Sequence, residues 1–297
     1  MKKHAPSGGG LPEARSVPEL ALREARILPS PGWEIPDFGE LWRHRHLLFV
    51  LVWRNVTRRY RQTLLGPVWF VISPLVRIVL YSLVLGRLAG LPSEGVPYPI
   101  FSYAALLPWE MFASGILRST GCFVTYEQII TKVYFPRLLV PAAEVMTAVV
   151  DFFLSFVILV AMAVFFGFYP NVKWLVLPFL LLMAAGLSLS VGFLFAALQV
   201  RYRDVANFMR YGVTFWFYAT PVAYSSTVLE GKVPDGLRAI YVYNPMNGVV
   251  EAFRWAMIGA GRAPDLTLGA TAVAIGALLF FSSMVFLKTE HSIVDLV

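Results

Sequence analysis

The sequence predicts an all-α polytopic membrane protein with six transmembrane helices. Its 297 residues are 58% hydrophobic and 14% charged, and the mean hydropathy is +0.65. Soluble domains are about 45–50% apolar and about 25% charged, so this chain must place apolar surface in a medium other than water. Its single cysteine, Cys122, excludes a disulfide scaffold within the chain.

Six stretches with few or no charges are long enough to cross a bilayer, for which a helix needs about 20 residues. The clearest lies between Lys173 and Arg201, and the second in order is weakened by Pro108 and Glu110. The predicted spans are 67–86, 99–117, 138–172, 174–200, 206–224 and 266–287. Small residues in the fourth and sixth spans predict close helix packing: Gly186, Ser190, Gly192, Gly269, Ala270 and Gly276.

The distribution of arginine and lysine orients these spans. Basic residues concentrate in segment 40–66 and in the loops after the second and fourth spans, and the net charge of the chain is +7. Short basic loops remain in the cytosol, so both termini are expected there. Residues 1–32 lack the apolar core of a signal peptide. We expect residues 1–37 to be a flexible cytosolic tail, with a short partner-binding element as the alternative, and 289–297 to be a cytosolic C-terminus.

Three segments are not simple spans. Segment 38–66 alternates apolar and basic residues, and Leu41, Leu48, Val52 and Val56 share one face of a helix. It is therefore expected to be an amphipathic helix lying in the cytosolic membrane interface. A polar helix is expected at 125–136 on the cytosolic side. Two short re-entrant helices are expected within 221–262, dipping into the outer leaflet. Irregular backbone at membrane depth needs protein or water around it, so this segment suggests the mouth of a pathway.

Signatures of catalysis are missing from the sequence. It contains no Gly-x-x-x-x-Gly-Lys-Ser/Thr phosphate loop. His44 and His46 could contribute to a metal site, but no cysteine or acidic cluster completes one, so a solvated helix face is favoured. We therefore expect a chain that is not an enzyme and holds no metal. The basic excess belongs to the membrane-facing helix and loops, so no nucleic-acid partner is predicted.

Four charged residues fall within predicted spans: Arg77, Glu110, Glu144 and Asp151. A charge facing lipid costs several kcal/mol, so these side chains should pair with one another or extend to the interface. The alternative for Arg77 is that it lines a pathway and meets an anionic group of a substrate.

The aromatic residues form two groups. Five tryptophans lie where an interfacial belt would place them: Trp33, Trp42, Trp53, Trp69 and Trp174. In the fifth span, Tyr211, Phe215 and Tyr218 share one helix face. Such a face could stack on the apolar faces of sugar rings, and ordinary helix packing is the alternative.

Five sequence motifs follow one another along the chain. The longest is W-R-N-V-T-R-R-Y-R-Q-T-L-L-G-P-V-W, from Trp53 to Trp69. The other four are Leu107-Pro108-Trp109, I-I-T-K-V-Y-F-P-R at 129–137, R-Y-R-D-V at 201–205 and Y-N-P-M at 243–246. In this order they resemble the motifs of the permease subunits of ABC type-two polysaccharide exporters, which move O-antigen, capsule or teichoic acid polymers. The resemblance covers residues 45–295, and the first motif is the most specific, with Asn55 where the family often has an acid.

The resemblance implies a role for each unusual segment. Helix 125–136 would be a coupling helix that docks on a separate ATP-binding subunit through Tyr126, Glu127, Ile129, Ile130, Lys132, Val133 and Tyr134. The interface helix would carry Trp53, Arg54, Arg58, Arg59 and Tyr60. The helices within 221–262 would be outer gate helices. Two copies of the chain would enclose a conduit lined by Arg77, Trp109, Tyr211, Phe215 and Tyr218.

The resemblance also implies the partners and the substrate. Two ATP-binding subunits would hold ATP and Mg, so this chain would carry no cofactor. The cargo would be a polyprenyl-diphosphate-linked polysaccharide, taken from the lipid of the bacterial inner membrane. The alternatives are a type-two exporter of teichoic acid, lipid or a drug, an ATP-independent channel or facilitator, and a membrane glycosyltransferase; against the last stands the absence of an acidic cluster.

Overall fold

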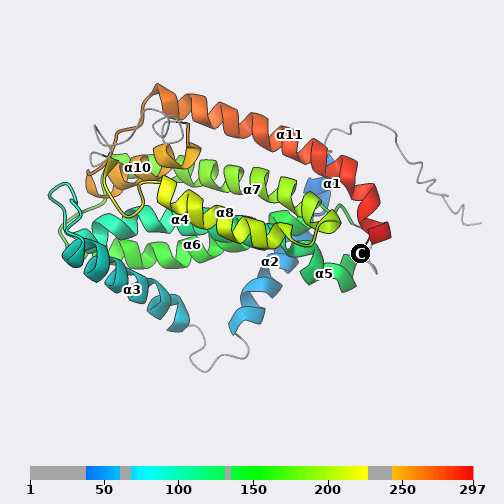
Figure 1. Cartoon of the computed structure of the whole chain (residues 1–297), viewed down its shortest axis with the longest axis horizontal. Helices are drawn as coiled ribbons and strands as arrows, with labels where there is room; N and C mark the ends of the chain where they lie inside the picture. Colours follow the sequence, from blue (N-terminus) through cyan, green and yellow to red (C-terminus); the bar gives the residue numbers. More distant parts are fainter. Residues whose placement is uncertain (1–37, 61–67, 131–134, 227–242, 297) are drawn as a thin grey trace, which may run out of the picture. The chain divides into compact units, whose positions relative to one another are not determined.

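A computed structural model describes residues 38–60, 68–130, 135–226 and 243–296. Every secondary-structure element in these ranges is helical (Figure 1). The α-helices are α1 (Phe38–Arg43), α2 (Arg45–Tyr60), α3 (Trp69–Tyr81), α4 (Tyr98–Thr120), α5 (Cys122–Ile130), α6 (Leu139–Phe165), α7 (Leu177–Arg201), α8 (Val205–Ala219), α10 (Pro245–Ile258) and α11 (Leu266–Leu296). A π-helix, Ser82–Leu88, extends α3, and a 3₁₀-helix, Val172–Val176, precedes α7.

Five of the predicted spans are confirmed as helices long and apolar enough to cross a membrane. They are Val71–Leu88, Tyr98–Thr120, Leu139–Phe165, Val172–Arg201 and Leu266–Thr289. The predicted fifth span, 206–224, corresponds to α8, which has only 15 residues and ends at Ala219. Because about 20 residues are needed for a straight crossing, the sixth crossing remains a prediction.

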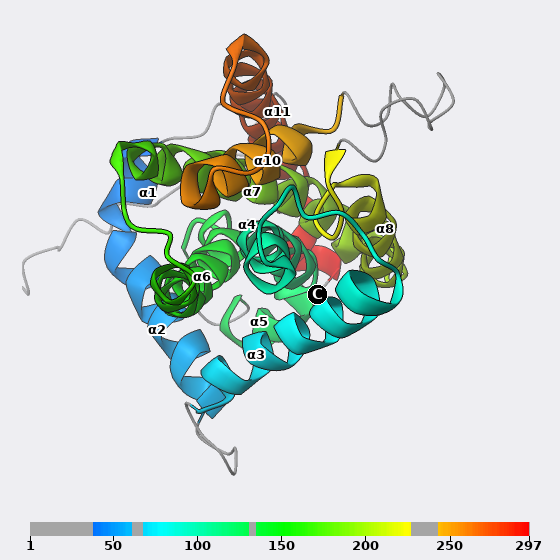
Figure 2. The same ribbon diagram turned by 90° about the vertical axis from the view of Figure 1, so that its left-hand side faces the viewer.

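Helix α4 is the centre of the described fold. It contacts α3, α6, α7, α8 and α10. Figure 2 shows these helices around α4. Most of its side chains from Ile100 to Thr120 are buried. Pro108 lies inside this helix without ending it. By contrast, α3 exposes Val71, Leu75 and Val79, which suits contact with lipid or with another chain.

The segments outside the spans agree only in part with expectation. The one amphipathic helix predicted over 38–66 is divided into α1 and α2, and α2 packs on α6. Leu41 of α1 and Leu48 and Val52 of α2 lie half-buried against a cluster that includes residues of α5, α6 and α7. The predicted apolar face therefore packs on protein. Of the two helices expected in 221–262, α10 is a buried helix packed on α4 and α7; the other falls in 227–242, outside the described residues. Re-entry of either remains a prediction.

Close packing of α4 on α7 depends on glycine. A Cβ atom added to Gly192 would lie 2.7 Å from Cβ of Ser119 in α4. The prediction of close packing is thus confirmed for Gly192. It is wrong for Gly269 and Gly276, where an added Cβ meets no atom within 4 Å, because these positions of α11 face away from its neighbours.

Replacing Gly192 by valine should separate α4 from α7. Overpacking a tight site costs about 1–3 kcal/mol, so we expect a lower unfolding temperature for the Gly192→Val chain purified in detergent. Gly276→Val is the matched control and should melt like the wild type, since open space surrounds its Cβ position. Equal melting of Gly192→Val and Gly276→Val would contradict the packing argument.

Candidate functional site

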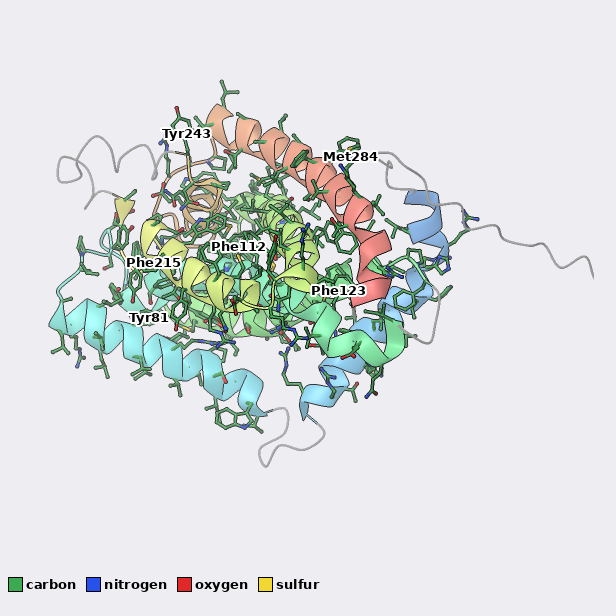
Figure 3. All side chains as sticks on the ribbon, turned by 45° about the vertical axis from the view of Figure 1, so that its right-hand side comes forward. Tyr81, Phe112, Phe123, Phe215, Tyr243 and Met284 are labelled. Atoms are coloured by element: carbon green, nitrogen blue, oxygen red, sulfur yellow. The ribbon has the colours of Figure 1, made fainter. Side chains whose placement is uncertain are left out.

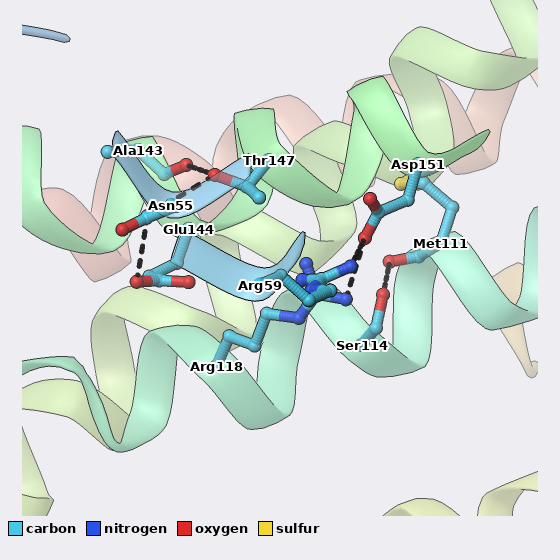
Figure 4. Close-up of polar contacts among 9 residues, drawn as sticks. All are labelled: Asn55, Arg59, Met111, Ser114, Arg118, Ala143, Glu144, Thr147 and Asp151. Carbon is cyan, nitrogen blue, oxygen red and sulfur yellow. Dashed lines mark hydrogen bonds and ion pairs between the residues drawn. The ribbon is translucent and has the colours of Figure 1, made fainter. Parts of the chain in front are cut away.

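A buried hydrogen-bond network joins α2, α5 and α6. Figure 4 shows its part between α2 and α6, where Asn55 contacts Glu144 and Thr147. The Asn55 side-chain amide donates to Oε1 of Glu144 over 3.1 Å and to Oγ1 of Thr147 over 3.3 Å. The Tyr126 hydroxyl lies 2.5 Å from Oδ1 of Asn55 and 2.9 Å from Oε1 of Glu144, and its one hydrogen serves one of these acceptors at a time. The network therefore fixes three helices to one another through four side chains.

Tyr126 is the residue of this network whose position differs most from expectation. It was predicted to dock on a partner, but its side chain is 1% exposed and points into the chain, because Asn55 and Glu144 offer acceptors there. The guanidinium of Arg54 lies 4.6 Å from the centre of its ring. Burial, and then the charge of Glu144, raise the pKa of Tyr126 from 10.0 to about 12. Tyr126 thus stays a protonated donor at physiological pH.

Some of the other residues predicted to dock on the ATP-binding subunit lie on α5, and the rest follow it in the sequence. Glu127 is exposed on α5, and Ile130 is half-buried at its end. Lys132, Val133 and Tyr134 and the side chain of Ile129 lie outside the described residues. The structure adds Val124, whose side chain is 67% exposed on the same helix. Thr125 and Gln128 are exposed as well, so α5 presents an open face that starts with an apolar residue.

The predicted residues of the interface helix are found mostly on the exposed side of α2. Trp53 is exposed and stacks on Phe49, with their ring centres 6.5 Å apart. Arg58 and Arg59 are exposed, whereas Arg54 is half-buried. The side chain of Tyr60 lies outside the described residues.

The charged residues within the spans are engaged with polar partners, as their cost in lipid predicts. Nε of Arg77 lies 2.7 Å from Oε1 of Glu110, which confirms the pairing expected for these two. Oδ2 of Asp151 accepts from Arg59 over 2.7 Å and from Arg118 over 2.8 Å (Figure 4). One carboxylate oxygen therefore holds two guanidinium groups, one from α2 and one from α4.

The predicted conduit residues are not brought together. Tyr211, Phe215 and Tyr218 form one exposed face of α8, and Figure 3 shows Phe215 on the outer side of that helix. Trp109 is 4% exposed and packs between Phe112 and Phe217, with ring centres 5.4 and 5.7 Å away. Trp109 therefore packs against the inner side of α8 within the chain, and its place in a conduit remains a prediction.

The aromatic residues of α8 lie on two faces, an exposed one and an inner one that packs on the rest of the chain. The indole of Trp216 meets Phe112 edge-on and donates to Oδ1 of Asn244 over 2.9 Å. The same Asn244 oxygen caps α10 by accepting from the amide of Met246. The Asn244–Pro245 motif thus ties α8 to the start of α10.

Two residues important to the packing of loops were missed in the sequence. Arg254 of α10 is 0% exposed and donates to the carbonyl oxygens of Pro221, Val222 and Phe101. Glu94 has a positive φ of 54° and accepts from Ser225 and, over 2.7 Å, from the amide of Gly261. A charge inside the apolar run of α10 was the available signal for Arg254.

These helices, with their paired charges and long apolar spans, define a multi-spanning helical membrane protein. Residues 46–258, most of the chain, match the ABC-2 type transporter family, and the chain belongs to that family. The resemblance deduced from the motifs is thereby confirmed. A member of this family is a component of a transporter and not a catalytic subunit.

Curated relatives support this assignment over most of their length. The chain is 28% identical over 249 residues to the O-antigen export system permease protein RfbA of Myxococcus xanthus. These 249 residues cover 83% of this chain and 94% of the relative. Two Klebsiella pneumoniae proteins with the same name are 27% and 26% identical over 209 residues, or 70% of this chain and 78% of theirs.

Proposed function

We propose that this chain is the membrane-spanning subunit of an ATP-driven exporter that moves a lipid-linked, O-antigen-like polysaccharide across the bacterial inner membrane. The observation that carries the proposal is the match to O-antigen export permeases over 83% of this chain and 94% of the relative. Both termini face the cytosol in this proposal, and α8 with the residues that follow it makes the sixth crossing.

The conduit lies between two copies of the chain. The exposed aromatic face of α8, formed by Tyr211, Phe215 and Tyr218, contacts the sugar rings. Stacking without dense hydrogen bonding suits a conducting site, because the polymer must leave each position as readily as it arrives. Helix α3, whose apolar side chains are exposed, borders the same conduit and brings Arg77 to it.

The ATP-binding subunit, which holds ATP and Mg, docks on α5. This helix begins directly after α4, and its exposed face carries Val124, Thr125, Glu127 and Gln128. An exposed apolar residue beside polar ones is typical of a helix that inserts into a groove of a partner. Motion of the ATP-binding subunit then reaches α2 and α6 through the Tyr126 network.

Replacing Val124 by aspartate should prevent docking while the chain still inserts in the membrane. A charge in an apolar contact centre costs several kcal/mol when it is desolvated, so we expect co-purification of the ATP-binding subunit to fall by at least about tenfold. Val172→Asp is the matched control, since Val172 is 81% exposed before α7 and is proposed to lie on the opposite side of the membrane. Equal loss of the partner from both variants, or from neither, would refute the docking surface.

Export itself is tested by deleting the gene and restoring it. Loss of long-chain polysaccharide from the cell surface, accumulation of the lipid-linked polymer inside, and recovery with the restored gene are the expected results. Surface polymer at the wild-type level in the deletion strain would overturn the proposal. Loss of a teichoic acid, a lipid or drug resistance instead would assign one of the alternative cargoes, and transport without an ATP-binding subunit would assign a channel.

A further inference from the structure

Two neighbouring cavities lie between α2, α3, α4 and α6, and α5 also borders the smaller one. The larger has a volume of about 550 Å³ and is lined by residues that include Arg59, Arg77, Glu110, Arg118 and Asp151. The smaller has a volume of about 390 Å³. Arg59 and Arg118 line both, so the two cavities meet at the pair of guanidinium groups held by Asp151.

The charges around these cavities favour an anion. Their walls contain four arginines (Arg58, Arg59, Arg77 and Arg118) and three carboxylates (Glu110, Glu144 and Asp151). Arg118 donates through Nη2 to Oδ2 of Asp151 and shares that oxygen with Arg59. Nη1 of Arg118 has no hydrogen-bond partner among the residues that the structure describes.

The arginines remain within reach of a ligand. The side chains of Arg59, Arg77 and Arg118 are 39%, 43% and 27% exposed, although each is in an ion pair. A planar guanidinium binds two oxygens of a phosphate at once and is only weakly hydrated. Three such groups from α2, α3 and α4 therefore form a site that suits phosphate oxygens.

The remaining walls of the larger cavity are mostly apolar, with three serines (Ser73, Ser114 and Ser155) among them. The apolar walls include the side chains of Trp69, Pro74, Leu107, Met111, Leu117 and Phe152. A free phosphate would leave these walls without a partner. A phosphate attached to a hydrocarbon chain would satisfy both parts, with its oxygens on the arginines and its first carbons along the apolar side chains.

We infer that the larger cavity binds the phosphate end of a membrane lipid. The specific ligand is the diphosphate that joins the lipid carrier to the polysaccharide. This inference rests on the proposed export of a lipid-linked polymer. In that setting the site would hold the carrier on the cytosolic half of the permease, beside α3. Arg59, on the interface helix, and Arg118, on the helix that leads into α5, would place the diphosphate next to the elements that receive motion from the ATP-binding subunit.

The test is binding to the full-length chain in nanodiscs, measured by native mass spectrometry with three probes. These are undecaprenyl diphosphate, undecaprenol with the same hydrocarbon chain and no phosphate, and phosphatidylglycerol. We expect the diphosphate to bind at least about tenfold more tightly than the alcohol, since a hydrogen bond to a charged group contributes about a factor of ten or more. Phosphatidylglycerol should bind more weakly than the diphosphate.

Single variants locate the site. Arg118→Gln and Arg77→Gln should each weaken binding of the diphosphate by about tenfold while binding of undecaprenol stays unchanged. That second readout separates loss of a phosphate contact from misfolding, which would reduce both. Arg201→Gln is the matched control, because Arg201 is exposed at the end of α7, outside both cavities, and contacts the ring of Tyr202.

Each outcome bears on one proposal. Wild-type affinity of both arginine variants for the diphosphate would overturn the site and leave the proposed export function standing. Phosphatidylglycerol binding as tightly as the diphosphate, with the same dependence on arginine, would show an ordinary phospholipid site and overturn the assignment to the carrier. Failure of export in the restoration experiment above would overturn the proposed function whatever binds here.

Discussion

Replacing Arg254 by leucine is expected to destabilise the whole helical assembly. Its guanidinium is 0% exposed and donates to three backbone carbonyl oxygens, those of Phe101 in α4 and of Pro221 and Val222 after α8. It also lies 3.9 Å from the centre of the Phe101 ring. Each buried carbonyl left without a donor costs about 1–3 kcal/mol, so we expect the free energy of unfolding to fall by about 3–5 kcal/mol.

The consequence should be visible as loss of the monodisperse chain in detergent and a much lower melting temperature. Arg262→Leu is the matched control, four residues beyond the end of α10, because Arg262 is 70% exposed and pairs with Asp265 at the surface. Exposed ion pairs contribute little to stability, so this variant should melt like the wild type. An Arg254→Leu chain as stable as the Arg262→Leu chain would contradict the role given to the buried guanidinium.

The spans could be predicted because each depends on its own sequence. A run of about 20 mostly apolar residues forms a helix in lipid, because a helix satisfies its backbone hydrogen bonds within the run itself, whatever its neighbours are. Five of the six expected spans are found for this reason. The end of α8 was more difficult to predict. Polar and aromatic residues of the same kind follow Ala219, where the helix ends, so composition alone does not mark that end.

The orientation of side chains could not be predicted in the same way. The sequence around Tyr126 alternates apolar and polar residues, which suggested an exposed docking face. Its hydroxyl turns inward because Asn55 and Glu144, 71 and 18 residues away, lie next to α5 in space. Trp109 is buried for a similar reason, since Phe112 and Phe217 cover it. Pairing of charges was predictable for Arg77 and Glu110, because an unpaired charge in a span is costly wherever it lies.

Breaking the network of Asn55, Tyr126 and Glu144 should separate docking from transport. Tyr126→Phe removes one hydroxyl, and Asn55→Leu removes the amide that reaches Glu144 and Thr147. Both leave the exposed face of α5 intact, so the ATP-binding subunit should still co-purify. Asn55→Leu loses at least the two hydrogen bonds that Asn55 donates to Glu144 and Thr147. A loss of about 1.4 kcal/mol changes an equilibrium constant tenfold, so export should fall by at least about tenfold in this variant.

A double-mutant cycle decides whether these side chains act as one unit. The Asn55→Leu and Tyr126→Phe effects on the free energy of unfolding should differ from additivity by about 1–2 kcal/mol, within the range found for residues in one hydrogen-bond network. Thr57→Val is the matched control on α2, since its hydroxyl donates to the carbonyl oxygen of Trp53 in the same helix, and it should be additive with Tyr126→Phe. If Asn55→Leu and Tyr126→Phe were additive and export were normal in both, α5 would have to move α2 and α6 by another route. The two measurements together therefore distinguish a network that transmits motion from one that only fills a buried space.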